Sequence, residues 1–191
     1  SAKPTGGEID VPENVIIIGG GDVAMDCATT AKELGGRNVA ILYRRTILEM
    51  PANKAEVEHV RKLGISIISN FNPVEIIGEN GRVKAIKAVG VDWKDRSTPV
   101  DVPETVLQMK AELVIQAIGQ KPEDLSYTGV MPTGKGLAAA DPETGKTNID
   151  GVYMAGDIVN GGKTVVEAVA RGKSAALSID AYLSSKREGG R

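Results

Sequence analysis

The sequence predicts an α/β fold with a parallel β-sheet, and three features of the chain carry that prediction. Val15 to Ile18 is a short apolar run that ends in glycines, as in a strand buried on both faces of a parallel sheet. Residues 22 to 34 then follow helical spacing, with one apolar stripe. Val39 to Tyr43 is a second apolar run. A strand, a glycine turn, a helix and a strand in this order make a βαβ unit, which almost always crosses over right-handed.

The following segments extend this sheet and add a second one. Pro51 stands where the first turn of a helix tolerates proline, so we expect a helix near Ala52–Leu63, ended by Gly64. Residues 65–69 predict a third short strand, and residues 113–118 predict a further strand of the buried parallel type. The runs 74–77 and 83–89 partly alternate, a turn with Asn-Gly separates them, and a weaker strand lies near 100–109. These predict an antiparallel β-meander.

The character of the chain changes after Gly119. Residues 120–150 are rich in Pro, Gly, Asp and Thr and contain few periodic segments. A short strand is expected at Val152–Ala155 and a long helix over Thr164–Leu183, and the polar tail from Ser184 to Arg191 is expected to fray. We therefore divide the chain into a first domain, 12–118, and a C-terminal segment, 119–191.

Composition argues against several classes of function. The chain has 191 residues, of which 41% are hydrophobic, enough to build a core. A net charge of -2 argues against general nucleic-acid or membrane binding, and 3% aromatic residues are too few for a base-stacking platform. No apolar run is long enough to span a membrane. The single cysteine, Cys27, excludes an intrachain disulfide framework and favours a reducing, cytoplasmic setting.

The glycine turn is a candidate dinucleotide-binding motif. Gly19-x-Gly21-x-x-Ala24 matches the G-x-G-x-x-G/A fingerprint of Rossmann domains. Gly19 permits the tight turn, Gly21 lets the backbone approach a pyrophosphate, and Ala24 allows close helix packing. The helix N-terminus also offers free N–H groups to phosphates. The predicted binding residues are Gly19, Gly20, Gly21, Asp22, Val23 and Ala24. The alternative is a Rossmann-like domain whose glycine turn binds nothing.

The end of the second strand indicates which dinucleotide binds. NAD sites usually place a carboxylate there, whereas NADP sites use arginine for the 2′-phosphate. This chain has Tyr43-Arg44-Arg45 and no acidic residue before Glu49. A charge-assisted hydrogen bond contributes ~1.5–3 kcal/mol when well formed, so even one favours NADP by about tenfold. The sequence predicts NADP(H), with solvated surface arginines as the alternative.

Several motifs resemble one enzyme family. Residues 15–27, 43–45 and 50–52 resemble the NADPH domain shared by the glutamate synthase small subunit, dihydropyrimidine dehydrogenase and related flavin oxidoreductases. Residues 117–122 resemble the second glycine motif of these enzymes, where the chain returns from the NADPH domain to the FAD domain. Residues 151–158 resemble their late FAD motif.

This resemblance implies NADP(H) and FAD as cofactors, with hydride passing from NADPH to FAD. It implies that Asp157 holds a ribityl hydroxyl of FAD and that the helix after Lys163 caps the far end of the flavin. The site residues it adds are Ala117, Ile118, Gly119, Gly156, Asp157, Thr164 and Val165. The electrons would pass to iron–sulfur clusters, or to another partner such as an amidotransferase-type subunit. No catalytic side chain or metal ligand is predicted, because the cofactors supply this chemistry.

The chain also departs from the family. Members carry an earlier strand and glycine loop for the FAD adenosine, and some carry a cysteine-rich iron–sulfur segment; neither is found here. We therefore interpret the chain as an NADPH domain plus the returning part of a FAD domain, which alone binds little FAD and is inactive. Its uncovered apolar surface predicts self-association. The alternatives are a stand-alone NADP(H)-sensing module and a simple NADP dehydrogenase, which would need a proton-handling residue.

Three further residues have ordinary interpretations. Cys27 lies on the apolar stripe of the first helix and is interpreted as a small buried hydrophobic residue. His59 lies among Glu56, Glu58 and other charged residues, as on a solvated helix face. Trp93 is either an interface contact or a packing residue at a hairpin tip, and the sequence leaves this open.

Overall fold

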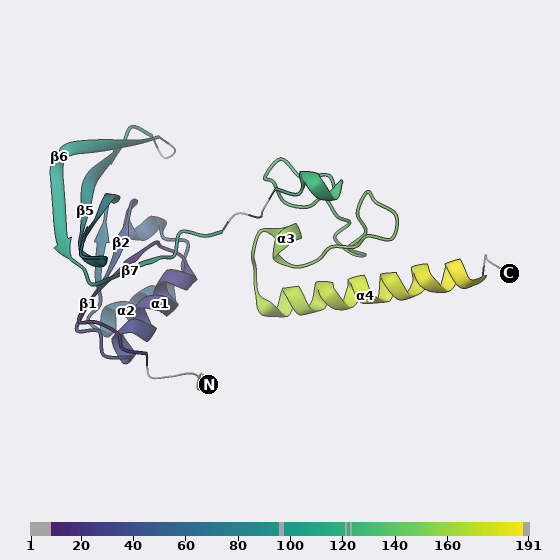
Figure 1. Ribbon diagram of the computed structural model, residues 1–191, viewed down its shortest axis with the longest axis horizontal. Helices are drawn as coiled ribbons and strands as arrows, with labels where there is room; N and C mark the ends of the chain where they lie inside the picture. Colours follow the sequence, from purple (N-terminus) through teal and green to yellow (C-terminus); the bar gives the residue numbers. More distant parts are fainter. Residues whose placement is uncertain (1–8, 96–97, 121, 123, 189–191) are drawn as a thin grey trace. The chain divides into compact units, whose positions relative to one another are not determined.

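The computed structural model describes residues 9–95, 98–120, 122 and 124–188. The chain divides into two compact units, Ser1–Gly119 and Gln120–Arg191 (Figure 1). That the second unit is part of a FAD domain stays a prediction.

A four-stranded parallel sheet forms the centre of the first unit. Its strands are β1 (Asn14–Ile18), β2 (Asn38–Tyr43), β3 (Ser66–Ser69) and β7 (Leu113–Gln116), in the order β3-β2-β1-β7. The chain runs outward from β1 to β3 on one side and resumes with β7 on the other. The carboxyl ends of β1 and β7 therefore flank a topological switch point, where open α/β sheets bind ligands.

Two helices cover one face of this sheet, α1 (Asp22–Glu33) and α2 (Lys54–Lys62). Alternate side chains of the strands point toward them, as the two-residue period of a strand requires. The fully buried side chains at this interface include Val15, Ile17, Met25, Ile41 and Val60. The burial of these aliphatic side chains holds α1 against the sheet and so positions the glycine turn between β1 and α1.

An antiparallel sheet covers the opposite face. It consists of β4 (Phe71–Glu79), β5 (Arg82–Trp93) and β6 (Pro99–Lys110), in the order β4-β5-β6. Asn80 and Gly81 both have positive φ angles, 52° and 74°, as a type I′ hairpin turn requires. The side chains shared by the two sheets include Ile16, Ile18, Leu42, Ile86 and Ala88. The predicted meander is thus confirmed as the layer opposite the helices.

The second unit contains little regular structure before its long helix. It has a 3-10 turn, η2 (Ser126–Thr128), a short helix, α3 (Asp157–Asn160), and α4 (Val165–Glu188). Its buried hydrophobic cluster consists of Leu125, Val130 and Ala138. Isolated β-bridges connect its loops.

The structure corrects three predicted elements. α2 begins at Lys54 rather than Ala52, because the Asn53 side chain caps it by accepting a hydrogen bond from Ala55 N at 3.0 Å. Residues 152–155 form no strand and contribute only a single bridge, at Tyr153.

The third correction concerns the tail. α4 continues through Ser184 to Glu188, because Asp150 anchors its last turns, and the rest of the predicted tail, 189–191, lies outside the described residues. Asp150 accepts hydrogen bonds from Tyr182 Oη at 2.7 Å and Lys186 Nζ at 3.4 Å. Lys121 of the predicted second glycine motif lies outside the described residues.

Candidate functional site

A cavity of about 590 Å³ opens at the carboxyl ends of β1, β2 and β7. All of its lining residues belong to the first unit. It brings together nine of the predicted site residues, namely Gly19, Gly20, Gly21, Tyr43, Arg44, Arg45, Ala117, Ile118 and Gly119. Its position is the one at which dinucleotides bind in sheets of this topology.

The three glycines of the turn have different physical reasons to be glycine. At Gly19 the φ angle is 146°, and a Cβ atom would collide with the carbonyl oxygen of Ala117. At Gly20 a Cβ atom would lie 2.5 Å from Cε2 of Tyr43. At Gly21 the φ angle is -92°, and a Cβ atom would meet no protein atom within 4 Å. The fold itself requires the first two glycines, whereas the space at the third fits a ligand close to the backbone.

The N-terminus of α1 offers unsatisfied hydrogen-bond donors beside this space. Gly21 is the N-cap residue and has no capping side chain, and its carbonyl accepts from Ala24 N and Met25 N. Among the residues that the structure describes, none accepts a hydrogen bond from the backbone N–H groups of Gly20, Gly21, Asp22 and Val23. These donors and the positive end of the helix dipole suit a phosphate group.

The segment before α2 folds back onto the glycine turn. Ala52 N donates a hydrogen bond to the Gly20 carbonyl at 3.1 Å. Asn53 N donates to Asp22 Oδ1 at 2.7 Å. The Asp22 carboxylate therefore satisfies a backbone N–H group at the start of the next helix, not one of α1. Asp22 thus links the N-terminus of α1 to the segment before α2, beside the cavity.

The two arginines after β2 have different surroundings. The Arg44 side chain is exposed, and no carboxylate of the described residues forms an ion pair with it. The Arg45 side chain is 28% exposed, and its Nη1 atom lies 3.4 Å from Glu49 Oε1. Glu49 also accepts hydrogen bonds from the hydroxyl and backbone N–H of Thr46, which hold the pKa of Glu49 below its ordinary value. Arg44 is therefore the guanidinium more available to a ligand.

We call residues 44–49 the arginine loop, and two aromatic side chains support it. Tyr43 Oη donates a hydrogen bond to the Glu49 carbonyl at 3.1 Å, and burial raises the pKa of Tyr43. Trp93, at the end of β5, lies against the Arg45 guanidinium. The sequence did not identify Trp93 as part of the site. The available signal was a single tryptophan, in a chain poor in aromatic residues, next to a polar hairpin turn.

The remaining predicted residues lie outside the cavity lining. Ala24 is fully buried and packs in the core, as close helix packing requires, while Val23 is 64% exposed. The second unit holds Gly156, Asp157, Thr164 and Val165. Gly156 precedes α3 with a φ angle of 78°, Val165 is 80% exposed, and Thr164 exchanges hydrogen bonds with Glu167.

Two candidates discounted on sequence grounds also lie elsewhere. Cys27 is half-buried and packs beside the core between α1 and the sheet. His59 is exposed on α2. Within the described part of the chain, no helix has both the length and the apolar character to cross a membrane.

Comparison with known proteins shows the family to which the chain belongs. The model of the pyridine nucleotide-disulphide oxidoreductase family matches residues 5–172. The chain belongs to this family. Its members are oxidoreductases that use NAD(P)H and FAD, the cofactor pair that the sequence predicts.

Curated relatives confirm the predicted resemblance. The chain is 43% identical to the NADP(+)-dependent formate dehydrogenase subunit beta of Moorella thermoacetica, over 88% of this chain and 25% of that protein. It is 38% identical to the glutamate synthase [NADPH] small chain of Azospirillum brasilense, over 92% of this chain and 38% of that protein. It is 36% identical to the NAD-dependent dihydropyrimidine dehydrogenase subunit PreT of Escherichia coli, over 95% of this chain and 40% of that protein. The chain spans two fifths or less of the length of these relatives.

Solved structures give the same fold. Thioredoxin reductase of T. acidophilum matches with a TM-score of 0.72 and 29% identity, over 90% of this chain and 52% of that one. Thioredoxin reductase of Lactococcus lactis matches with a TM-score of 0.76 and 23% identity, over 90% of this chain and 53% of that one. The relatives' names include both NADP and NAD, so the choice between the two nucleotides depends on the site.

Proposed function

We propose that the first unit binds NADPH, and that the chain is the NADPH-binding part of a flavin-dependent oxidoreductase. One observation carries the proposal: unsatisfied backbone donors and an exposed arginine face the same cavity at the switch point of the sheet. The donors suit a pyrophosphate, and the arginine suits the 2′-phosphate that distinguishes NADPH from NADH.

The pyrophosphate would lie against the N-terminus of α1. Its oxygens would accept hydrogen bonds from the amides at residues 20–23, and the missing Cβ of Gly21 leaves the room for this approach. The Asp22 carboxylate accepts a hydrogen bond from Asn53 N, which holds it toward the segment before α2. The adenosine end would then reach the arginine loop along the carboxyl end of β2.

The 2′-phosphate would lie beside Arg44, with Arg45 as a second, partly neutralised cation. A guanidinium can donate two parallel hydrogen bonds to a phosphate, and Arg44 has no competing carboxylate within the described chain. One such bond, at ~1.5 kcal/mol, corresponds to about a tenfold preference for NADPH.

The hydride step belongs to the bound cofactors, since NADPH donates a hydride and FAD accepts it. On this proposal the first unit orients the donor through the glycine turn and the arginine loop. In the second unit, Asp157 and the start of α4, at Thr164 and Val165, would contribute to the flavin site. Iron–sulfur clusters or an amidotransferase-type subunit would receive the electrons, as suggested by relatives named as subunits or chains of larger oxidoreductases.

The proposal is tested by measuring dissociation constants for NADPH and NADH by isothermal titration. The parent chain should bind NADPH at least about tenfold more tightly, and Arg44→Ala should remove most of that difference while leaving NADH affinity unchanged. Arg82→Ala, at the exposed turn between β4 and β5, is the matched loss of one arginine and should change neither constant. Equal affinities in the parent chain would contradict the proposal.

A further inference from the structure

Trp93 reaches the arginine loop from the antiparallel sheet. It is the only tryptophan of the chain and lies 49 residues beyond Arg44. The Arg45 Cζ atom lies 4.3 Å from the centroid of the Trp93 ring, within the range of a cation–π contact. The indole Nε1–H also donates a long hydrogen bond, 3.4 Å, to the Arg44 carbonyl. One side chain therefore contacts both residues of the arginine pair.

The tryptophan is itself held in place by the hairpin. Its backbone N–H donates to Asp92 Oδ1 at 2.8 Å, and it pairs with Pro99 across β5 and β6. Beyond it, the Asp95 carboxylate accepts hydrogen bonds from the backbone and hydroxyl of Thr98. The ring is therefore presented from a paired strand end rather than from a free loop.

Arg45 is fixed between two supports. The Trp93 ring lies against its guanidinium, while Glu49 holds it by an ion pair at 3.4 Å. Glu49 is itself set by the capping box with Thr46. A long arginine side chain loses conformational freedom when it binds a phosphate, and a side chain already held loses less. The hydrogen bond to the Arg44 carbonyl restrains the backbone that presents the exposed guanidinium.

We propose that Trp93 is a specificity-positioning residue: it holds the arginine pair in the arrangement that receives the adenosine 2′-phosphate. This inference rests on the proposed NADPH site and deepens it. It assigns part of the choice of nucleotide to the antiparallel sheet, outside the βαβ unit that carries the sequence fingerprint. Trp93 need not touch the nucleotide, since it acts through Arg44 and Arg45.

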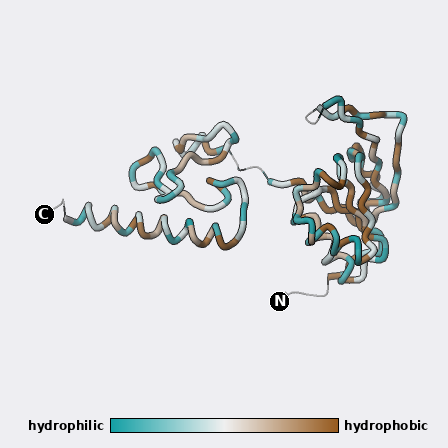
Figure 2. The backbone as a smooth tube through the Cα atoms, turned by 180° about the vertical axis from the view of Figure 1, so that it is seen from behind, coloured by the Kyte–Doolittle hydropathy of each residue, from teal (hydrophilic) through white to brown (hydrophobic). Residues whose placement is uncertain are grey.

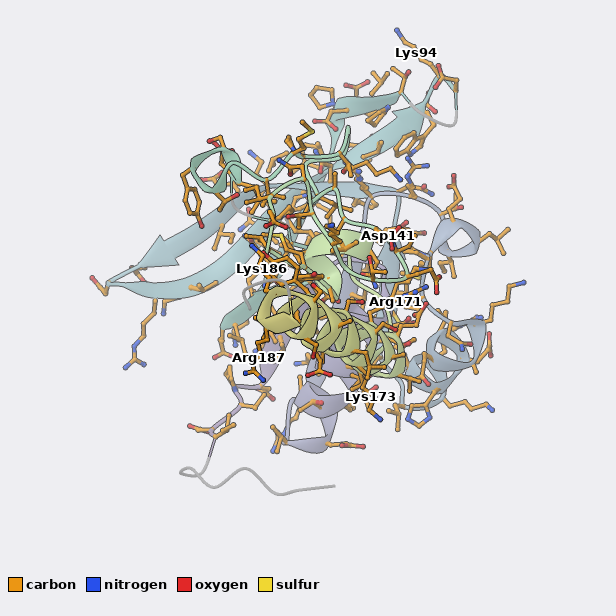
Figure 3. The ribbon with its side chains drawn as sticks, turned by 90° about the vertical axis from the view of Figure 1, so that its right-hand side faces the viewer. Lys94, Asp141, Arg171, Lys173, Lys186 and Arg187 are labelled. Carbon is orange, nitrogen blue, oxygen red and sulfur yellow. The ribbon has the colours of Figure 1, made fainter. Side chains whose placement is uncertain are left out.

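The test compares NADPH and NADH binding in Trp93→Ala, Trp93→Phe and a matched control in the same hairpin. The control is Lys94→Ala, because the Lys94 side chain extends away from the molecule into solvent (Figure 3). Trp93→Ala should lower the preference for NADPH about threefold to fivefold, as expected for a partly exposed cation–π contact. Trp93→Phe, which keeps an aromatic face, should lower it less. NADH affinity should stay unchanged in every variant, and Lys94→Ala should match the parent.

The outcomes separate this inference from the proposed function. If the parent prefers NADPH and Trp93→Ala keeps the full preference, the site stands and the role of Trp93 is wrong. If Trp93→Ala weakens both nucleotides equally, Trp93 has a general structural role and the inference is also wrong. If the parent shows no preference, the proposed function fails and this inference with it.

Tryptophan fluorescence gives a second readout without any substitution. Because Trp93 is the only tryptophan, its emission reports directly on the arginine loop. Titration with NADP(+) should change that emission, and 5′-AMP, which lacks the 2′-phosphate, should change it less at the same fractional saturation. An emission unaffected by saturating NADP(+) would overturn the inference.

Discussion

The two units of this chain bury their apolar side chains to very different extents. The first unit buries one cluster on each face of its parallel sheet. Among its described residues the second buries one small cluster, and along α4 the side chains of Val165, Val166 and Leu177 are 80%, 78% and 74% exposed. Figure 2 shows apolar residues gathered in the strands of the first unit and interspersed with polar ones along α4.

This difference explains why the nucleotide-binding motifs of the first unit are held by a packed core, whereas the FAD-like motifs of the second unit are not. In the first unit, the parallel sheet places the glycine turn, the arginine loop and the 116–119 segment around one cavity. In the second, the motif residues stand at the start of a short helix and of a largely exposed long helix. Exposed apolar surface of this kind is typical of a docking face, and self-association through it stays a prediction.

The largest expected effect is on stability and sharpens this comparison. Ile17→Ala removes a fully buried side chain between the sheet and the helices, and should lower the free energy of unfolding by about 2–5 kcal/mol. Leu177→Ala, the matched truncation in α4, should change it by less than about 0.5 kcal/mol. Urea denaturation followed by circular dichroism measures both. A large loss in Leu177→Ala would mean that α4 is covered in solution.

A smaller effect concerns the glycine turn. Gly21→Ala places a methyl group in open space at an ordinary φ angle, so the melting temperature should stay near that of the parent. The same methyl group would obstruct a pyrophosphate, so NADPH affinity should fall about tenfold or more. Gly20→Ala is the matched control and should destabilise the fold, because its methyl group would meet the Tyr43 ring. Unchanged NADPH binding in Gly21→Ala would place the phosphate elsewhere.

The smallest effect is expected at the end of α4. Tyr182→Phe removes the hydroxyl that donates to Asp150, and this hydrogen bond is the main cause that holds the pKa of Asp150 below its ordinary value. A lowered carboxyl pKa stabilises the fold above the unfolded value of about 3.9, and this contribution is lost as the pH falls through the folded value. The small difference in melting temperature between Tyr182→Phe and the parent should therefore disappear in acid. A difference that persists after Asp150 is protonated in the folded state would mean that the hydroxyl acts through packing.

The elements predicted correctly from the sequence are those whose hydrophobic periodicity matches the side chains that they bury in the structure. The apolar runs of β1 and β2 and the stripe of α1 each have one period, and the structure uses them as expected. The run at 152–155 was wrongly predicted as a strand because an apolar run alone does not supply a partner to pair with. The start of α2 was misplaced because the Asn53 cap, rather than Pro51, sets it.

The candidate site was predictable where the residues are close in sequence. The glycine turn follows from spacing, and the end of β2 follows from the rules of nucleotide choice. The different surroundings of Arg44 and Arg45 were not predictable, because they depend on the turn that brings the Glu49 carboxylate back to Arg45. The contribution of Trp93 was hidden for the same reason, since only the stacking of two sheets brings β5 to the arginine loop.

The most direct test of the central claim is thermal unfolding of the chain with NADPH, NADH or no nucleotide. A ligand that binds the folded state adds RT ln(1 + [L]/Kd), about 2.7 kcal/mol at a hundredfold excess over Kd. We expect a rise in melting temperature with NADPH that clearly exceeds the rise with NADH at equal concentration. No rise with either nucleotide at millimolar concentration would contradict the claim that the first unit forms a dinucleotide-binding site.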